Sequence, residues 1–163
     1  MILQNSLFPP ESSWTVPDVF PQFSETETVA IDLETYDPHL MTCGPGWATG
    51  RGHVVGIGVA TKDWEGYFPI RHEGGGNLDE GMVLRWLTKL LSSTKREVVF
   101  HNALYDVGWL RREGVIVKGK ILDTIIAAPL INENRFSYSL DNLGAAYCNE
   151  KKDESLLQDA ALA

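Results

Sequence analysis

The stretch Val29–Thr35 has the sequence Val-Ala-Ile-Asp-Leu-Glu-Thr, an apolar run that ends in two carboxylates, Asp32 and Glu34. In a β-strand, residues i and i+2 point to the same face, so the two carboxylates project side by side and Leu33 points the other way. Like charges this close repel, and burying them is costly unless a cation compensates. Divalent metals with oxygen ligands fit that need. The stretch therefore predicts half of a Mg²⁺ or Mn²⁺ site, with a solvated strand end as the alternative.

The composition is that of a single globular domain. The chain has 163 residues, of which 44% are hydrophobic and 22% charged, and this length suffices for one core. No apolar stretch is long enough to span a bilayer, and Met1–Asn5 lacks the features of a secretory signal. The two cysteines, Cys43 and Cys148, lie far apart without metal-ligand spacing. We expect free thiols in a reducing compartment.

The net charge of −8 limits the ways in which the protein can bind nucleic acid. It argues against a broad basic surface that grips a nucleic acid through its phosphates. It leaves open an enzyme that takes a short nucleic-acid end into a cleft where metal ions supply the positive charge.

The pattern of apolar residues predicts the order of elements. Residues 1–26 are rich in Pro and isolated aromatics and predict an extended arm that packs on the domain surface, whereas the Gly- and Pro-containing residues 36–52 predict a loop. Glycines alternate in the strand 53–60, which suggests close approach of another backbone. We expect strands at 29–35, 53–60, 64–70, 97–100 and 115–117. We expect helices at 104–112, 121–131, 139–147 and 153–163, and a further helix that ends at 91 and has either Asn77 or Asp79 as its cap.

This order predicts an α/β fold with a mixed sheet, in which three antiparallel strands are followed by parallel strands and helices flank the sheet. The strand that carries Asp32 and Glu34 should be central because it is the most continuously apolar.

A second polar cluster follows the buried strand 97–100. The stretch His101–Asp106 opens a helix and places Asp106 in its first turn, where the helix dipole favours a negative charge. That preference alone is one explanation of the aspartate. If the two strands are neighbours, however, Asp106 approaches Asp32 and Glu34 at the carboxyl ends of the strands, where open α/β sheets place their sites.

The order Asp-x-Glu closing a strand and His-Asn-x-x-x-Asp opening a helix resembles the first two motifs of the DEDD 3′–5′ exonucleases. The resemblance covers residues 27–150 and includes Ile121-Leu122-Asp123-Thr124 and Ser139-Leu140-Asp141-Asn142-Leu143. Within that superfamily, Tyr67–His72 is similar to the Pro-x-x-His stretch of the proofreading domain of family A DNA polymerases of the phage or bacterial type.

The resemblance implies a ribonuclease-H-like fold and two-metal hydrolysis of phosphodiesters with Mg²⁺ or Mn²⁺. Asp32 would bind both metals, Glu34 one metal near the terminal 3′-hydroxyl, and Asp106 the second metal. The substrate would be contacted by Leu33, Thr35, Asn102 and Tyr105. For Leu33 a place in the core is an equal alternative.

The resemblance also implies a biological role. The chain would remove nucleotides from a single-stranded DNA 3′ end as the proofreading part of a polymerase, with a polymerase domain C-terminal to it. The setting would be the cytoplasm of a bacterium or a phage-infected cell, with no membrane association. The alternatives are an exoribonuclease of the same superfamily and a non-catalytic ribonuclease-H-like domain that binds a partner.

One part of the family pattern is missing. The family places a fourth carboxylate on a late helix, in a Tyr-x-x-x-Asp motif for family A polymerases. Tyr138 and Asp141 have the wrong spacing, and Asp159 is the only late candidate. We therefore expect residues 27–163 to form an exonuclease domain that is incomplete at its C-terminus, binds metal loosely and is weakly active or inactive by itself.

Other residues near the motifs favour structural roles. We expect Asp123 to act as a cap or hydrogen-bond acceptor, and His72 and His101 to be structural histidines. Trp86 and Trp109 occupy apolar helical positions and should lie in the core.

Overall fold

The computed structural model describes residues 15–150. The chain divides into two compact units, Val16–Glu133 and a smaller unit that includes residues 134–150. Along the described part of the chain, no helix combines the length and the hydropathy needed to cross a membrane.

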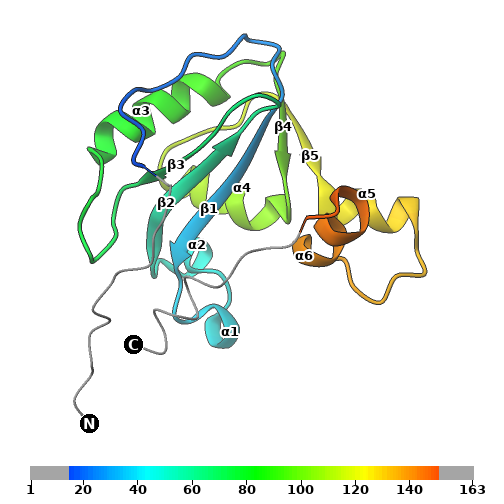
Figure 1. The fold of residues 1–163 in the computed structure, drawn as a ribbon. Coiled ribbons are helices and arrows are strands. Elements are labelled where there is room, and N and C mark those ends of the chain that lie inside the picture. The colour runs from blue at the N-terminus through cyan, green and yellow to red at the C-terminus, as the bar shows by residue number, and fades with distance from the viewer. Residues whose placement is uncertain (1–14, 151–163) are drawn as a thin grey trace, which may run out of the picture. The chain divides into compact units, whose positions relative to one another are not determined.

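The larger unit is built on a five-stranded sheet (Figure 1). Its strand order is β3-β2-β1-β4-β5. β1, β2 and β3 pair antiparallel, whereas β4 pairs parallel to β1 and β5 parallel to β4. The predicted mixed sheet and the central place of β1 are therefore confirmed. The strands are β1 (Val29–Tyr36), β2 (His53–Ala60), β3 (Glu65–Pro69), β4 (Glu97–Phe100) and β5 (Lys120–Asp123).

The two faces of β1 differ as its sequence predicts. Buried and exposed residues alternate along the strand. Asp32 and Glu34 are exposed, whereas Leu33 is only 7% exposed and belongs to the hydrophobic core. The apolar side of the sheet thus fixes which side carries the carboxylates.

The helices α3 (Glu80–Leu91) and α4 (Ala103–Arg112) complete this core. α3 buries Val83, Leu87, Leu90 and Leu91, the spacing of an amphipathic helix. Its N-terminus is capped by Asp79, whose side chain accepts a hydrogen bond from Met82 N at 2.7 Å. On α4, Trp109 is fully buried, as predicted.

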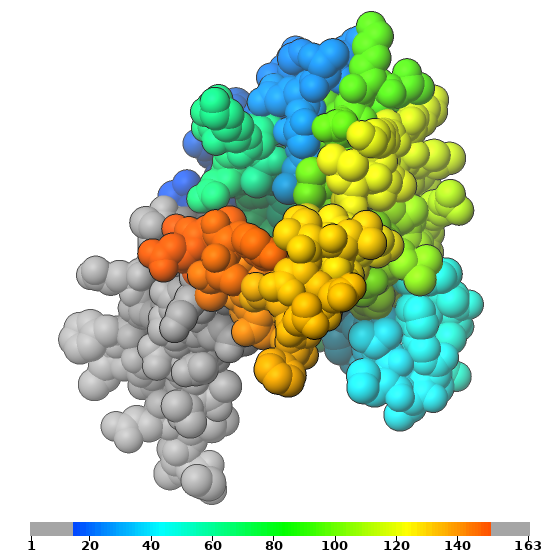
Figure 2. Space-filling model, turned by 90° about the vertical axis from the view of Figure 1, so that its right-hand side faces the viewer, coloured from blue at the N-terminus to red at the C-terminus, as the bar shows by residue number. Residues whose placement is uncertain are grey.

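Two segments differ from the predicted elements. Residues 36–52 contain two one-turn helices, α1 (Leu40–Cys43) and α2 (Gly46–Thr49), rather than loop alone. α1 contacts α2, and α2 contacts α4. Figure 2 shows α1 and α2, coloured cyan, as one surface projection. Short helices joined by Gly and Pro have too little periodicity to be read from sequence.

The last strand lies later in the chain than predicted. Residues 115–117 form no strand; instead β5 begins at Lys120, where it pairs with β4. The predicted helix 121–131 is consequently shortened to α5 (Thr124–Ile131), with Pro129 inside it. The apolar pair Ile121-Leu122 suits a strand and a helix equally, and the cap at Asp123 marks the true boundary.

The smaller unit contains the predicted helix 139–147 in a modified form. α6 (Leu140–Leu143) begins after Ser139, whose side chain accepts from Asn142 N, and a π-helical turn (Gly144–Cys148) follows. The predicted helix 153–163 and Asp159 lie outside the described residues. Cys43 and Cys148 are both free and exposed.

Aromatic residues of the predicted N-terminal arm belong to the larger unit and pack against residues of its β2–β3 hairpin. Phe20 stacks on Phe68 with ring centroids 5.7 Å apart, and Phe23 lies 5.5 Å from Trp64. Trp86 packs against the core and donates its indole N–H to Pro21 O at 2.9 Å. The part of the arm before residue 15 lies outside the described residues, so the boundary at residue 26 stays a proposal.

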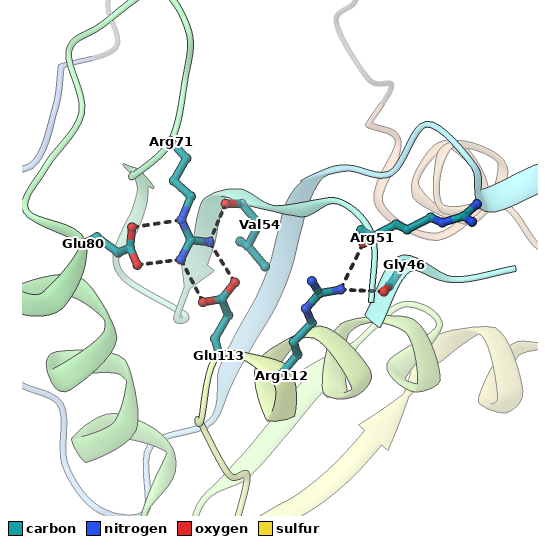
Figure 3. Close-up of polar contacts among 7 residues, drawn as sticks. All are labelled: Gly46, Arg51, Val54, Arg71, Glu80, Arg112 and Glu113. Atoms are coloured by element: carbon teal, nitrogen blue, oxygen red, sulfur yellow. Dashed lines mark hydrogen bonds and ion pairs between the residues drawn. The ribbon is translucent and has the colours of Figure 1, made fainter. Parts of the chain in front are cut away.

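Two arginines join the end of α4 to other elements (Figure 3). Arg71 binds Glu113 through two hydrogen bonds of 2.7 and 2.9 Å, Glu80 through two of 2.6 and 2.9 Å, and Val54 O at 3.0 Å. The hydrogen bonds that Arg71 donates to both carboxylates raise its pKa, so it keeps its positive charge. This cluster ties the end of β3 to both helices.

The second arginine, Arg112, holds the α2 segment. It donates to Gly46 O at 2.6 Å and to Arg51 O at 3.0 Å (Figure 3). Its guanidinium carbon lies 5.3 Å from the centre of the Trp109 ring. Lys120 pairs with Glu97 at 2.9 Å. These two basic residues therefore have structural partners.

Candidate functional site

The candidate site lies where β1 meets the first turn of α4. Asp106 is only 4% exposed, and its Oδ1 accepts a hydrogen bond from Leu33 N at 3.2 Å. The sequence motif of β1 is thus joined to the motif of α4 through the backbone between Asp32 and Glu34. The predicted approach of Asp106 to β1 is seen in this bond.

The carboxyl group of Asp106 is in an environment that disfavours its charge. Burial, followed by repulsion from Asp32, raises its pKa from 3.8 to about 7, and the hydrogen bond from Leu33 N only partly opposes this. Asp123 adds a smaller repulsion. Both charged groups that act on Asp106 are acidic, which makes the region receptive to a cation.

Asp123 fixes the backbone that presents Asp106. Its carboxylate accepts hydrogen bonds from Asn102 N (3.0 Å), Ala103 N (2.8 Å) and Ile125 N (3.1 Å). One side chain therefore caps the N-termini of α4 and α5 together. This confirms the structural role expected for Asp123.

Asn102 has a left-handed backbone conformation, with φ of 73° and ψ of 56°. Such a conformation is uncommon outside glycine, although asparagine adopts it more readily than most residues. The side chain is exposed and does not cap α4. It is therefore free to meet a ligand at the end of β4.

His101 next to it has the structural role expected. Its Nδ1 lies 2.8 Å from Thr124 Oγ1, which in turn donates to Phe100 O at 3.1 Å.

A second chain of hydrogen bonds joins β1 to α4. Thr35 Oγ1 lies 2.8 Å from Tyr105 Oη, which donates to Asp37 Oδ2 at 3.0 Å. The same Asp37 oxygen accepts from Gly46 N at 2.8 Å. Burial is the main cause of a raised pKa of Tyr105, so this phenol remains a proton donor. Asp37 was not among the residues singled out from the sequence.

Tyr67 is a further residue near the carboxylates. It opens the stretch Tyr67–His72 that resembles the family, but the sequence indicated no role for it at the site. Its pKa is raised to about 12 by burial and then by repulsion from Glu34 and Asp32, so its hydroxyl lies within the field of both. Tyr67 Oη is 2.6 Å from His72 Nε2. The sequence signal that could have indicated Tyr67 is the pair of glycines in β2, because they leave room on the face of the sheet that carries the carboxylates.

Leu33 was predicted to contact the substrate, but its side chain points away from the carboxylates. It lies in the core, on the opposite side of β1 from the carboxylates. This matches the alternative left open by the sequence, and the part of Leu33 that faces the site is its backbone N–H.

The acidic side chains at the candidate site are of a type that binds metal ions, but they do not form a complete set of metal ligands. Within residues 15–150, no three His, Cys, Asp or Glu side chains are grouped so that they could hold a metal ion together. The carboxylate oxygens of Asp32 and Asp106 and the repulsion between these groups fit a hard divalent cation. The assignment of metal ligands and substrate contacts therefore stays a proposal.

Known proteins with similar sequences include a family of exonuclease domains and several DNA polymerases. A family model described as 3′–5′ exonuclease matches residues 11–160. A DNA-directed DNA polymerase of Pseudomonas phage M6 is 39% identical over 169 residues, covering 98% of this chain and 25% of that polymerase. The DNA polymerase DpoZ of Salmonella phage PMBT28 is 29% identical over 88% of this chain and 21% of its own length. The chain thus spans about a quarter of the length of these relatives.

Solved structures share the architecture. Brucella melitensis NrnC with bound Mg²⁺ has a TM-score of 0.58 at 18% identity, over 78% of this chain and 56% of that one. Escherichia coli RNase D, an exoribonuclease, has a TM-score of 0.55 at 14% identity, over 79% of this chain and 30% of that one. At these identities the likeness concerns the fold, which is ribonuclease-H-like.

Proposed function

Because the chain belongs to the 3′–5′ exonuclease family of A-type DNA polymerases, we propose that it removes nucleotides from the 3′ end of single-stranded DNA with the help of divalent metal ions. In this proposal it is the proofreading part of a polymerase whose synthetic domain follows it. The observation that carries the proposal is the buried Asp106, held by Leu33 N and repelled by Asp32. No basic side chain among residues 15–150 pairs with this carboxylate, so its position is suited to a cation.

Asp32, Glu34 and Asp106 would hold the ions in the complete site. Two Mg²⁺ or Mn²⁺ ions would supply Lewis-acid activation of a water molecule and neutralise charge at the leaving 3′-oxygen. The exposed side chains of Asp32 and Glu34 face the substrate side of the sheet. The Leu33 N–H keeps one oxygen of Asp106 oriented and leaves the other for a ligand.

The neighbouring residues would position the nucleic acid. Asn102 presents an amide at the end of β4 that can donate to a phosphate or sugar oxygen. Tyr105 is held by Thr35 and Asp37, so the face of its ring can support the terminal base or sugar without sequence preference. Thr35 contributes by fixing this ring.

A cleavage assay tests the proposal. The chain is incubated in excess over a 5′-labelled single-stranded DNA oligonucleotide with Mn²⁺, so that weak activity is visible. We expect stepwise shortening from the 3′ end, and its loss in Asp32→Asn. The matched control is Asp63→Asn, which removes an exposed carboxylate in the turn between β2 and β3.

Two outcomes decide between the alternatives. An RNA oligonucleotide of the same sequence that is shortened faster than the DNA would make the chain an exoribonuclease. Cleavage that Asp32→Asn leaves unchanged would contradict the proposal. The absence of both cleavage and Mn²⁺ binding would favour a non-catalytic domain.

A further inference from the structure

Tyr67 lies on the same face of the sheet as the carboxylates, two strands away from them. Its Cα partner on β2 is Gly58, and the partner of Gly58 on β1 is Asp32. Directly paired residues of antiparallel strands point to the same face, so these three positions form one row across the sheet. The middle position has no side chain, which leaves the row open between the phenol and the aspartate.

The ring of Tyr67 crosses β2 over a second glycine. A Cβ atom at Gly56 would lie 1.8 Å from Tyr67 Oη and 2.2 Å from its Cζ. The Cα partner of Gly56 on β1 is Glu34. The phenol therefore ends at the position facing Glu34. The close approach expected from the glycines is made by a side chain and not by another backbone.

His72 holds the hydroxyl end of Tyr67. Tyr67 Oη and His72 Nε2 are 2.6 Å apart, and the rings meet edge to face with centroids 5.7 Å apart. The backbone of His72 is fixed in turn, because Asn77 accepts from its N–H at 2.7 Å and donates to its carbonyl at 2.8 Å. The residue before His72, Arg71, is anchored by its hydrogen bond to Glu113 (Figure 3). The hydroxyl is thus preorganised by residues that lie outside the carboxylate cluster.

We propose that Tyr67, held by His72 and accommodated by Gly56, is a positioning residue that orients the carboxylate of Glu34 for metal binding. The proposal rests on the function proposed above. Residues that hydrogen-bond to metal ligands fix the ligand geometry, and their removal typically weakens metal affinity by about 10–100-fold. The raised pKa of Tyr67, caused by burial and then by Glu34 and Asp32, agrees with a phenol that keeps its proton beside these carboxylates.

Mn²⁺ affinity of the whole chain, measured by calorimetry, tests this role. Tyr67→Phe keeps the ring and removes the hydroxyl, and we expect about tenfold weaker binding with unchanged thermal unfolding. The matched control is Tyr36→Phe, because Tyr36 also packs on a histidine, His53, at 5.4 Å. That variant should bind Mn²⁺ as the unchanged chain does.

Glycine substitutions give a second comparison. Gly56→Ala should weaken Mn²⁺ binding as well, because the added methyl group displaces the phenol. Gly58→Ala should not, because its Cβ would lie at ordinary contact distances of 3.6 and 3.7 Å from Asp32 atoms.

A double-mutant cycle separates positioning from general packing. If Tyr67 acts through Glu34, Tyr67→Phe should cause no further loss of affinity in a Glu34→Gln background. Equal loss in both backgrounds, or no loss from Tyr67→Phe, would overturn the positioning role. If Asp106→Asn abolishes Mn²⁺ binding while Tyr67→Phe binds Mn²⁺ as tightly as the unchanged chain, this inference alone fails. If the unchanged chain binds no Mn²⁺, the proposed function fails and the inference with it.

Discussion

The backbone N–H of Leu33 donates a hydrogen bond to the carboxylate of Asp106 across 73 positions of sequence. Leu33 anchors β1 in the core with its side chain and orients an acidic residue of α4 with its backbone. The geometry of the candidate site is therefore coupled directly to the packing of the central strand. Substitutions that shift Leu33 should therefore also disturb Asp106.

Replacement of Asp106 should stabilise the metal-free chain at neutral and alkaline pH. Asp106→Asn retains an oxygen for the Leu33 N–H and removes the buried charge. A carboxyl whose pKa rises from 3.8 to about 7 on folding lowers the free energy of unfolding by at most about 4 kcal/mol at high pH. Because the site relaxes around the charge, we expect Asp106→Asn to raise the free energy of unfolding by about 2 kcal/mol. Urea unfolding with a chelator at pH 8 measures this gain.

The pH dependence of that gain has a defined sign. Below about pH 4 the carboxyl is protonated in both the folded and the unfolded state, so the variant has no advantage. Between pH 4 and 7 the unfolded state loses its proton first, and the advantage grows until it levels off above pH 7. A constant difference between the variant and the unchanged chain over pH 4–8 would contradict the buried charge.

Loss of Asp123 should destabilise the chain more than loss of an ordinary helix cap. Asp123→Ala leaves three backbone N–H groups of α4 and α5 without their acceptor, and we expect a loss of about 3 kcal/mol. The control Asp79→Ala removes one cap bond at α3 and should cost about 1 kcal/mol. Equal losses in chemical unfolding would mean that Asp123 does not clamp both helices.

The ion pair of Arg71 and Glu113 should contribute more to stability than the exposed pair of Lys120 and Glu97. Glu113 is 14% exposed and makes two hydrogen bonds to Arg71, so Glu113→Gln should lower the free energy of unfolding by about 1–2 kcal/mol. Glu97→Gln should change it by less than about 0.5 kcal/mol, because Lys120 is 67% exposed. Thermal unfolding of both variants checks the ranking.

The sequence predicted the parts of the fold that depend on local pattern. The alternation around Asp32 and Glu34 is enough to place them on one face, and the apolar character of β1 is enough to place it centrally. The boundary between β5 and α5 was missed because Ile121 and Leu122 satisfy either pattern. Only pairing with β4 decides the outcome.

The candidate site was predictable only where its residues belong to a motif. The side chain of Tyr67 lies over Gly56, the strand partner of Glu34, because of the register of three strands and the absence of a side chain at Gly56. Asp37 belongs to the candidate site because it accepts a hydrogen bond from Tyr105, and this bond depends on how β1 and α4 are packed. Apart from the alternating glycines of β2, such relationships arise from tertiary structure and leave no short-range signal.

The most direct test of the metal site is the anomalous scattering of manganese in crystals of the chain soaked in MnCl₂. We predict a peak within coordination distance, about 2.0–2.3 Å, of oxygens from Asp32 and Asp106, and the loss of that peak in Asp106→Asn crystals. Manganese bound only elsewhere on the protein, with these two carboxylates left uncoordinated, would contradict the account.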